Sequence, residues 1–198
     1  MKGKIKANTV DKYLLPIRKQ IVDLIGSNSS VVELGCGNGD LLFHLSSKIN
    51  QGIGYDNNPQ LITYAKEKSK TLNLKHISFE CSDLSQSTEA PCSDYSIASL
   101  FYHVMPKETA INLLKLQLKH AKTVIICGFS APSSSKQSFL LWLDQRFSGH
   151  FKNFKEYQNF GYMEGLLNSI ENLEYRCIDT FDPVIKIYCL EQLDKLSY

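Results

Sequence analysis

The chain lacks the features that mark several classes of protein. Its six cysteines include no C-x-x-C pair, so the clustered ligands of a structural zinc site are missing. We expect these cysteines to be reduced thiols, most of them in the core. No apolar run approaches the roughly 20 residues of a membrane-spanning helix. The formal net charge is only +2, which gives no strong signal for binding nucleic acid.

The N-terminus is basic, like the start of a secretory signal. Charged residues follow at Asp11, Lys12, Arg18 and Lys19, and they leave no apolar core for such a signal. The sequence therefore predicts a cytoplasmic protein with no metal site and no membrane partner. Its 198 residues, 43% apolar and 21% charged, fit one globular domain.

Strand-like and helix-like stretches alternate along the chain, as βαβ units on a parallel sheet do. Five strands are expected, at 30–34, 52–55, 76–79, 95–101 and 123–127. Leu41, Leu42, Leu45 and Ile49 fall on one helical face between the first two. Two more strands, 173–179 and 184–190, are separated by a short turn and suggest an antiparallel hairpin.

The fold class that follows is α/β: a doubly wound, mainly parallel sheet of seven strands with an antiparallel C-terminal hairpin strand. Residues 1–198 are expected to form a single domain. Residues 1–26 are its N-terminal segment and opening helix, with Ile17, Ile21 and Ile25 on the buried face. Asn58 and Pro59 predict the start of a helix after the second strand, as its N-cap and first residue.

The first expected strand runs into a glycine-rich turn, VVELGCGNGD at residues 31–40. Glycines are needed where the backbone adopts conformations closed to other residues, or where a ligand lies against the main chain. The carboxyl end of a first strand is also where an open α/β sheet places its ligand crevice. A glycine triplet alone fits a tight strand–helix turn equally well.

Two acids strengthen the ligand interpretation. Asp56 closes the second strand about 20 residues beyond the glycine turn, where a ribose-binding acid is expected. Asp83 lies just past the third strand, where its carboxylate could reach an exocyclic adenine amine. Each acid taken singly could be a cap or a loop residue. Together, at the ends of successive strands, they favour nucleoside recognition.

These motifs resemble those of the class I S-adenosylmethionine (SAM)-dependent methyltransferases, over nearly the whole chain. The family's first-turn pattern is matched by ELGCGNG at 33–39, and its acids after the second and third strands by Asp56 and Asp83. Its fourth strand is matched by residues 94–103, DYSIASLFYH. The resemblance implies a SAM cofactor and a Rossmann-like fold. It also implies a reacting methyl group near Phe101, Tyr102 and His103.

The strongest competitor on this fold is an NAD(P)-dependent oxidoreductase. Its fingerprint is G-x-G-x-x-G, and the third glycine here comes one residue too early. Asp40 in the following turn would also oppose a pyrophosphate. An acidic rim of Glu33, Asp40, Asp56 and Asp83 suits the sulfonium cation of SAM better. A degenerate SAM-fold module that only binds a partner is the non-enzymatic alternative.

Several residues are candidates for the chemistry. His103 titrates in the range of a general base, with an ordinary strand-end histidine as the alternative. Tyr102 could place its ring near the sulfonium. The signature of nucleobase amine methylases is missing. That of cytosine-C5 methylases is missing too, since Pro91-Cys92 precedes the fourth strand. A small-molecule acceptor is therefore expected, with a protein or RNA as the alternative.

The segment 130–170, between strands five and six, is a possible lid over the acceptor. Phe139, Trp142, Leu143, Phe147, Phe151 and Phe154 recur at helical spacing, and such a stripe is more often core than ligand site. Ser148-Gly149-His150 would break the helix and present His150 near Tyr157 and Tyr162. The first 15 residues could also fold over the cofactor.

The expected site residues form two sets. The residues expected to contact the cofactor are Glu33, Gly35, Cys36, Gly37, Gly39, Asp56, Asn57, Ser82, Asp83, Leu84 and Phe101. Those expected to act at the acceptor are His103, Tyr102 and His150.

Overall fold

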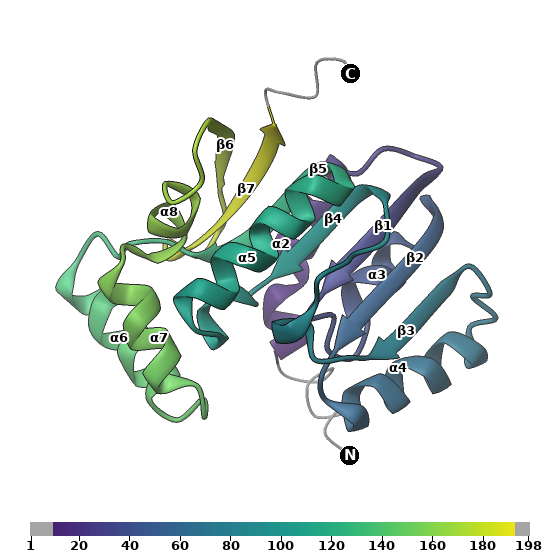
Figure 1. Ribbon diagram of the computed structural model, residues 1–198. Helices are drawn as coiled ribbons and strands as arrows, with labels where there is room; N and C mark the ends of the chain where they lie inside the picture. Colours follow the sequence, from purple (N-terminus) through teal and green to yellow (C-terminus); the bar gives the residue numbers. More distant parts are fainter. Residues whose placement is uncertain (1–9, 193–198) are drawn as a thin grey trace.

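The computed structural model describes residues 10–192, in which helices cover both faces of one sheet (Figure 1). The sheet order is β3-β2-β1-β4-β5-β7-β6. The strands are β1 (Ser29–Leu34), β2 (Ile49–Asp56), β3 (Ile77–Cys81), β4 (Ser93–Ser99), β5 (Ala121–Phe129), β6 (Leu173–Asp179) and β7 (Ile185–Gln192). The first 15 residues, expected to fold over the cofactor, lie partly outside the described range.

The helices alternate with these strands. They are α2 (Val10–Leu24), α3 (Asp40–Leu45), α4 (Pro59–Thr71), α5 (Lys107–His120), α6 (Ser135–Arg146), α7 (Phe151–Asn159) and α8 (Tyr162–Leu167), with 3-10 turns η1 (Leu84–Gln86) and η2 (Tyr102–Val104). In Figure 1, α5 lies in front of the sheet and α2 and α3 lie behind it. Right-handed crossovers between parallel strands produce this two-sided cover.

The strand pairing confirms the expected fold class. β1 pairs in parallel with both β2 and β4, so Val32 lies opposite Ile53 on one side and Ser96 on the other. β7 runs antiparallel between β5 and β6. The sheet is thus seven-stranded and mainly parallel, with an antiparallel C-terminal strand. Asn58 caps α4 by accepting hydrogen bonds from the amides of Gln60 and Leu61, as its position before Pro59 predicts.

One helical assignment was wrong. Ile49 has the spacing of the α3 face but belongs to β2, because α3 ends at Leu45. The Ser46 amide bonds back to the Phe43 carbonyl, and the Lys48 amide to the Leu45 carbonyl. These bonds turn the chain so that Ile49 pairs with Ser29, the first residue of β1. Strand pairing and burial in the sheet therefore override the helical spacing that relates Leu45 to Ile49.

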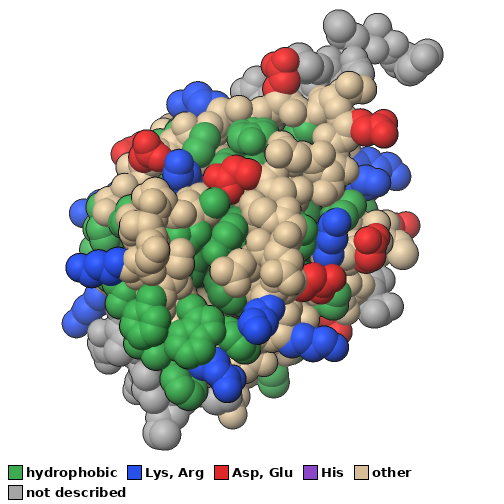
Figure 2. All heavy atoms as spheres, turned by 90° about the vertical axis from the view of Figure 1, so that its left-hand side faces the viewer, with side chains coloured by type: hydrophobic (Ala, Val, Ile, Leu, Met, Phe, Trp, Pro, Cys, Tyr) green, Lys and Arg blue, Asp and Glu red, His purple; other side chains and the backbone are tan. Residues whose placement is uncertain are grey.

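The aromatic stripe of α6 is also largely misassigned. Phe154 on α7 is buried, but Phe139, Trp142, Leu143 and Phe147 are exposed, the last at 83%. α6 instead buries Leu141 and Gln145. Figure 2, seen from the side where α6 and α7 lie in Figure 1, shows hydrophobic side chains gathered in one region with Lys and Arg at its edges.

Other sequence expectations concern cysteines, metals and membranes. All six cysteines are free thiols, but Cys81, Cys92 and Cys177 are exposed, so only half of the set lies in the core. Between residues 10 and 192, no three His, Cys, Asp or Glu side chains cluster as a metal site would require. Within the same range, no helix has the length and apolar character needed to cross a membrane.

Candidate active-site cleft

A cleft of about 1290 Å³ opens where β1, β2 and β4 end. The arrowheads of these parallel strands point to the same side of the molecule in Figure 1. α2, η2, α6 and the β6–β7 turn supply the remaining walls. Ligand pockets usually measure about 300–1,000 Å³, so this cleft has room for two molecules side by side.

The glycine turn forms the floor of the cleft. Gly35, Gly37 and Gly39 have φ angles of +69°, +57° and +79°, in the left-handed region that side chains disfavour. A Cβ on Gly35 would overlap the ring of Phe101, and one on Gly39 would overlap Phe79. Gly35 and Gly37 line the cleft but Gly39 does not. Gly39 therefore serves packing, and its position does not fit the expected contact with a cofactor.

The Asp56 carboxylate is fixed against this turn. Its Oδ2 accepts a hydrogen bond of 2.9 Å from the Gly37 amide, and its Oδ1 one of 2.8 Å from the Asn58 amide. A carboxylate has about four acceptor positions, so each oxygen retains acceptor capacity for a ligand hydroxyl. Asp56 and Asn57 both line the cleft. The side chain is therefore held in place before any ligand binds.

The end of β3 completes this wall. The Ser82 amide donates to the Asp56 carbonyl at 3.0 Å, which ties the ends of β2 and β3 together. The Asp83 carboxylate accepts from the Ser85 amide at 3.0 Å, and this bond lowers the pKa of Asp83. Ser82, Asp83 and Leu84 all line the cleft. An ionised, exposed carboxylate therefore lines the same cleft as the β2 acid.

The exit of β4 carries a strained residue that the sequence did not indicate. Leu100 has a φ of +49°, a conformation that costs a residue with a side chain roughly 1–2 kcal/mol. Its amide donates to the Cys127 carbonyl at 2.8 Å, which holds the turn. The chain then directs Phe101 over Gly35, where the missing Cβ leaves space for the ring. Strain of this kind is often found at functional sites.

His103 faces the cleft from an aromatic environment. The side chain is 8% exposed, and its ring contacts Phe129 edge-on with centroids 4.9 Å apart. Phe154 and Tyr157 approach it at 6.4 and 6.2 Å. Burial, and to a smaller extent the nearby His150, lowers the pKa of His103 to about 3. The imidazole is therefore uncharged at neutral pH and can accept a hydrogen bond.

This depressed pKa predicts an acid-sensitive fold. The unfolded chain binds a proton on His103 near pH 6.5, whereas the folded chain does not until about pH 3. The His103 contribution to stability is therefore complete above pH 6.5 and is lost as the pH falls below it. Between pH 6.5 and about 4.5, the free energy of unfolding of the wild type should fall by roughly 2 kcal/mol more than that of His103→Phe. Urea titrations of both proteins measure this; parallel curves contradict it.

Tyr102 does not fit its expected place beside the methyl group. Its hydroxyl donates to Gln117, whose Nε2 in turn donates to Ser96 at 2.7 Å. The side chain is 1% exposed and lies outside the cleft lining. The 3-10 turn η2 begins at Tyr102 and directs this ring toward α5, while Phe101 and His103 face the cleft. Tyr102 joins η2 to α5, and burial raises the pKa of its hydroxyl.

The segment 130–170 is divided between scaffold and cleft wall. α7 is fixed, because Asn153 donates to the Val104 carbonyl and Tyr157 to the Phe129 carbonyl, both at 2.7 Å. Tyr157 is 1% exposed and does not line the cleft, so it belongs to the scaffold. His150 at the start of α7 does line it, as do Gln137, Leu140 and Leu141 of α6.

A buried ionic network behind the glycine turn was missed by sequence reasoning. Arg18 of α2 pairs with Asp11 at 2.9 Å and with Asp40. Asn38 donates to the second oxygen of Asp11 at 2.7 Å. Asp40 shares the Arg18 cation with Asp11 and lies outside the cleft lining, so its assignment to an acidic rim was wrong. Arg18 on the apolar face of a helix, one residue after Ile17, was the available signal.

Comparison with known proteins places this geometry in context. A family model described as "Methyltransferase domain" matches residues 25–188. The N-methyltransferase NodS of Bradyrhizobium japonicum, solved with S-adenosylhomocysteine (SAH), superposes with a TM-score of 0.67 at 15% identity, covering 90% of this chain and 86% of NodS. LaPhzM superposes with a TM-score of 0.70 at 18% identity, over 96% of this chain and 58% of LaPhzM. At identities this low, the superpositions show a shared fold and nothing further.

Among curated proteins, the chain is similar to the 23S rRNA (uracil(1939)-C(5))-methyltransferase RlmD of Francisella tularensis. The two are 27% identical over 82 residues, which is 41% of this chain and 18% of RlmD. The chain spans about a fifth of the length of the first curated relatives it matches.

Proposed function

The chain belongs to the methyltransferase domain family, and we propose that it transfers a methyl group from S-adenosylmethionine to a small molecule with an apolar body. Support comes chiefly from the Asp56 carboxylate, which the Gly37 and Asn58 amides hold against the glycine turn. A carboxylate in this position suits the two hydroxyls of a ribose. The bare backbone at Gly37 suits a ligand lying flat against the main chain.

The residues of the cleft fit this cofactor. Asp56 would hold the ribose and Asp83 the adenine amine, while Phe101 and the glycine turn border the methionine portion. Bound there, SAM supplies an electrophilic methyl carbon on a positively charged sulfur. The protein then has to align the acceptor with that carbon and exclude water. His103, uncharged and buried, accepts a hydrogen bond from an acceptor hydroxyl or amine and orients its lone pair.

The charge of the cleft favours a small acceptor over RNA. Counted over the described residues, the lining holds one side chain of the Lys or Arg type, Arg18, which is already paired with Asp11 and Asp40. Five carboxylates line the same cleft: Glu33, Asp56, Asp83, Asp144 and Asp182. RNA binding relies on Lys and Arg to neutralise phosphates, so this lining would repel it. The acceptor end is mainly apolar and includes Met105, Phe129, Leu140, Leu141, Val184 and Ile185.

Calorimetry tests the cofactor assignment. SAM and SAH should bind with micromolar affinity in a one-to-one complex, and NADH should produce no heat of binding. The SAH complex should show no detectable affinity for single-stranded RNA at about 150 mM salt, where electrostatic binding is already weakened. Binding of NADH instead of SAH would favour an oxidoreductase. Tight, salt-dependent RNA binding would contradict a small-molecule acceptor.

A further inference from the structure

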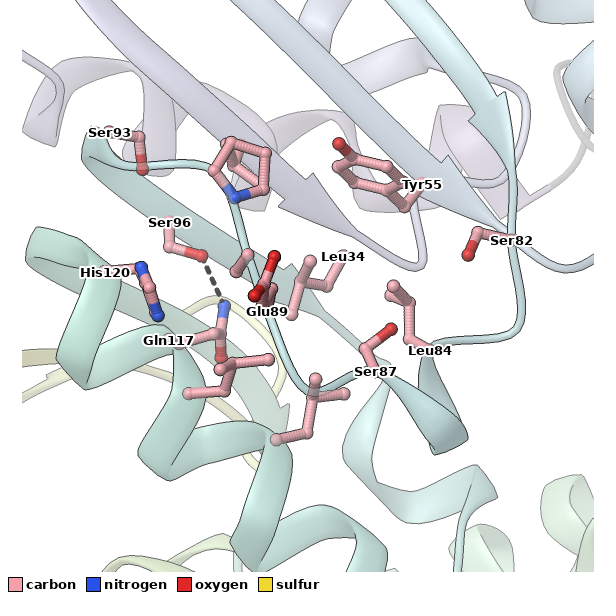
Figure 3. Close-up of a pocket in the computed structure, with 15 residues that line it drawn as sticks. Leu34, Tyr55, Ser82, Leu84, Ser87, Glu89, Ser93, Ser96, Gln117 and His120 are labelled. Atoms are coloured by element: carbon pink, nitrogen blue, oxygen red, sulfur yellow. Dashed lines mark hydrogen bonds between the residues drawn. The ribbon is translucent and has the colours of Figure 1, made fainter.

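A second cavity lies on the face of the sheet covered by α5 (Figure 3). It shares only Ser82 and Leu84 with the lining of the cleft. The chain crosses from β3 to β4 over β2 and β1, a path that usually contains a helix. Residues 82–92 contain only the short turn η1. A space of about 140 Å³ remains between this connection, the sheet and α5.

We propose that this cavity binds a neutral, single-ring aromatic molecule carrying one hydroxyl group, of which phenol is the simplest. The volume is close to that of an engineered apolar cavity of about 150 Å³ that binds benzene. Much of the wall is aliphatic: Val32, Leu34, Leu84, Leu113 and Leu116. An aromatic ring fills such a space with dispersion contacts that a few loosely held waters do not make.

Four polar side chains lie at one end of the cavity, whereas Tyr55, Ser82, Ser87 and Glu89 line it elsewhere. Figure 3 places Ser93, Ser96, Gln117 and His120 at that one end, with Leu34 and Leu84 toward the other side. Ser93 is 8% exposed, and its hydroxyl has no hydrogen-bond partner among the described residues. A buried hydroxyl without a partner is costly, so a ligand hydroxyl at this point would relieve that cost.

The same end of the cavity selects a neutral ligand. Gln117 already accepts from Tyr102 and donates to Ser96 at 2.7 Å, so its amide is largely occupied within the protein. The lining contains no Lys or Arg, and its one carboxylate, Glu89, is on an exposed residue. A charged group on the ligand would lose its hydration without gaining a buried counter-ion.

Methyl NMR of the intact protein tests the assignment, because Leu and Val line both the cavity and the cleft. Phenol should shift the Val32, Leu113 and Leu116 methyl signals saturably, with a dissociation constant on the order of 0.1–1 mM for so small a ligand. Ser93→Ala should weaken phenol binding roughly 3- to 10-fold and leave toluene binding unchanged. Leu116→Phe should abolish binding of both probes by filling the space.

Ile111→Phe is the matched control, since Ile111 lies on α5 outside the cavity lining, and this variant should bind both probes normally. Shifts confined to the cleft methyls of Leu61 and Leu141 would overturn the proposal. So would the absence of saturable shifts, or equal phenol affinity in Ser93→Ala and the wild type. If Leu116→Phe fails to fold, the comparison of phenol with toluene in Ser93→Ala still decides the outcome.

Discussion

Replacing Gly37 by valine should weaken SAH binding by roughly 100-fold or more. The residue has a φ of +57° and lines the cleft. A β-branched side chain disfavours this backbone conformation and would project where the ligand is expected to rest. Relaxation of the turn to relieve the strain would also break the bond from the Gly37 amide to Asp56. Both effects act on the same ligand, and calorimetric titration with SAH measures their sum.

Gly149→Val is the matched control for this substitution. Gly149 has a φ of +83°, but a Cβ there meets no atom within 4 Å, and the residue lies outside the cleft lining. The control should lose some stability and keep its affinity for SAH. Comparable losses of affinity in the two variants would mean that backbone strain alone is responsible. Undiminished affinity in Gly37→Val would show that the ligand does not rest on the turn.

The second large effect is expected at Arg18. Substitution by methionine should lower the free energy of unfolding by roughly 3–5 kcal/mol. Asp11 and Asp40 would then be left without their shared cation, and Asp11 is only 4% exposed. Removing one partner of a buried ionic group leaves uncompensated charge that the protein interior solvates poorly. Urea denaturation followed by circular dichroism gives the value.

Lys122→Met provides the comparison, because Lys122 pairs with Asp94 at 2.7 Å but is largely exposed. Its loss should change stability little, as is usual for surface ion pairs. If Arg18→Met and Lys122→Met have equal effects, the network beneath the glycine turn does not stabilise the fold as described. A double variant, Arg18→Met with Asp11→Leu, should recover part of the lost free energy of unfolding. It removes the Asp11 carboxylate that the Arg18→Met variant leaves without a cation.

Strand ends were the most predictable part of the site. In a parallel sheet the carboxyl ends of neighbouring strands lie at one edge, so the order of Asp56 and Asp83 along the chain was enough to bring them together. β4 shows the limit of such reasoning. Tyr102 and His103 are adjacent in sequence, yet η2 directs one toward α5 and the other into the cleft. A 3-10 turn after a strand has no periodic signature that would reveal this.

Contacts between distant segments were not predictable in the same way. Arg18 and Asp40 belong to different helices, and no local pattern shows that α2 packs beside the glycine turn. The helical spacing of α6 was read correctly as a helix, but periodicity does not say which face is buried. Leu141 and Gln145 face inward, whereas Phe139 and Phe147 do not. Which face of α6 is buried depends on the elements packed against it, and only the structure shows these.

A crystal structure of the protein with SAH is the most direct test of the central claim. The ribose hydroxyls should lie within hydrogen-bond distance of the Asp56 carboxylate, about 2.5–3.0 Å. The adenine should lie beside Asp83, and the sulfur should face the space between Phe101 and His103. A nucleoside bound elsewhere in the cleft, or a complex in which Asp56 makes no contact with the sugar, would contradict the account.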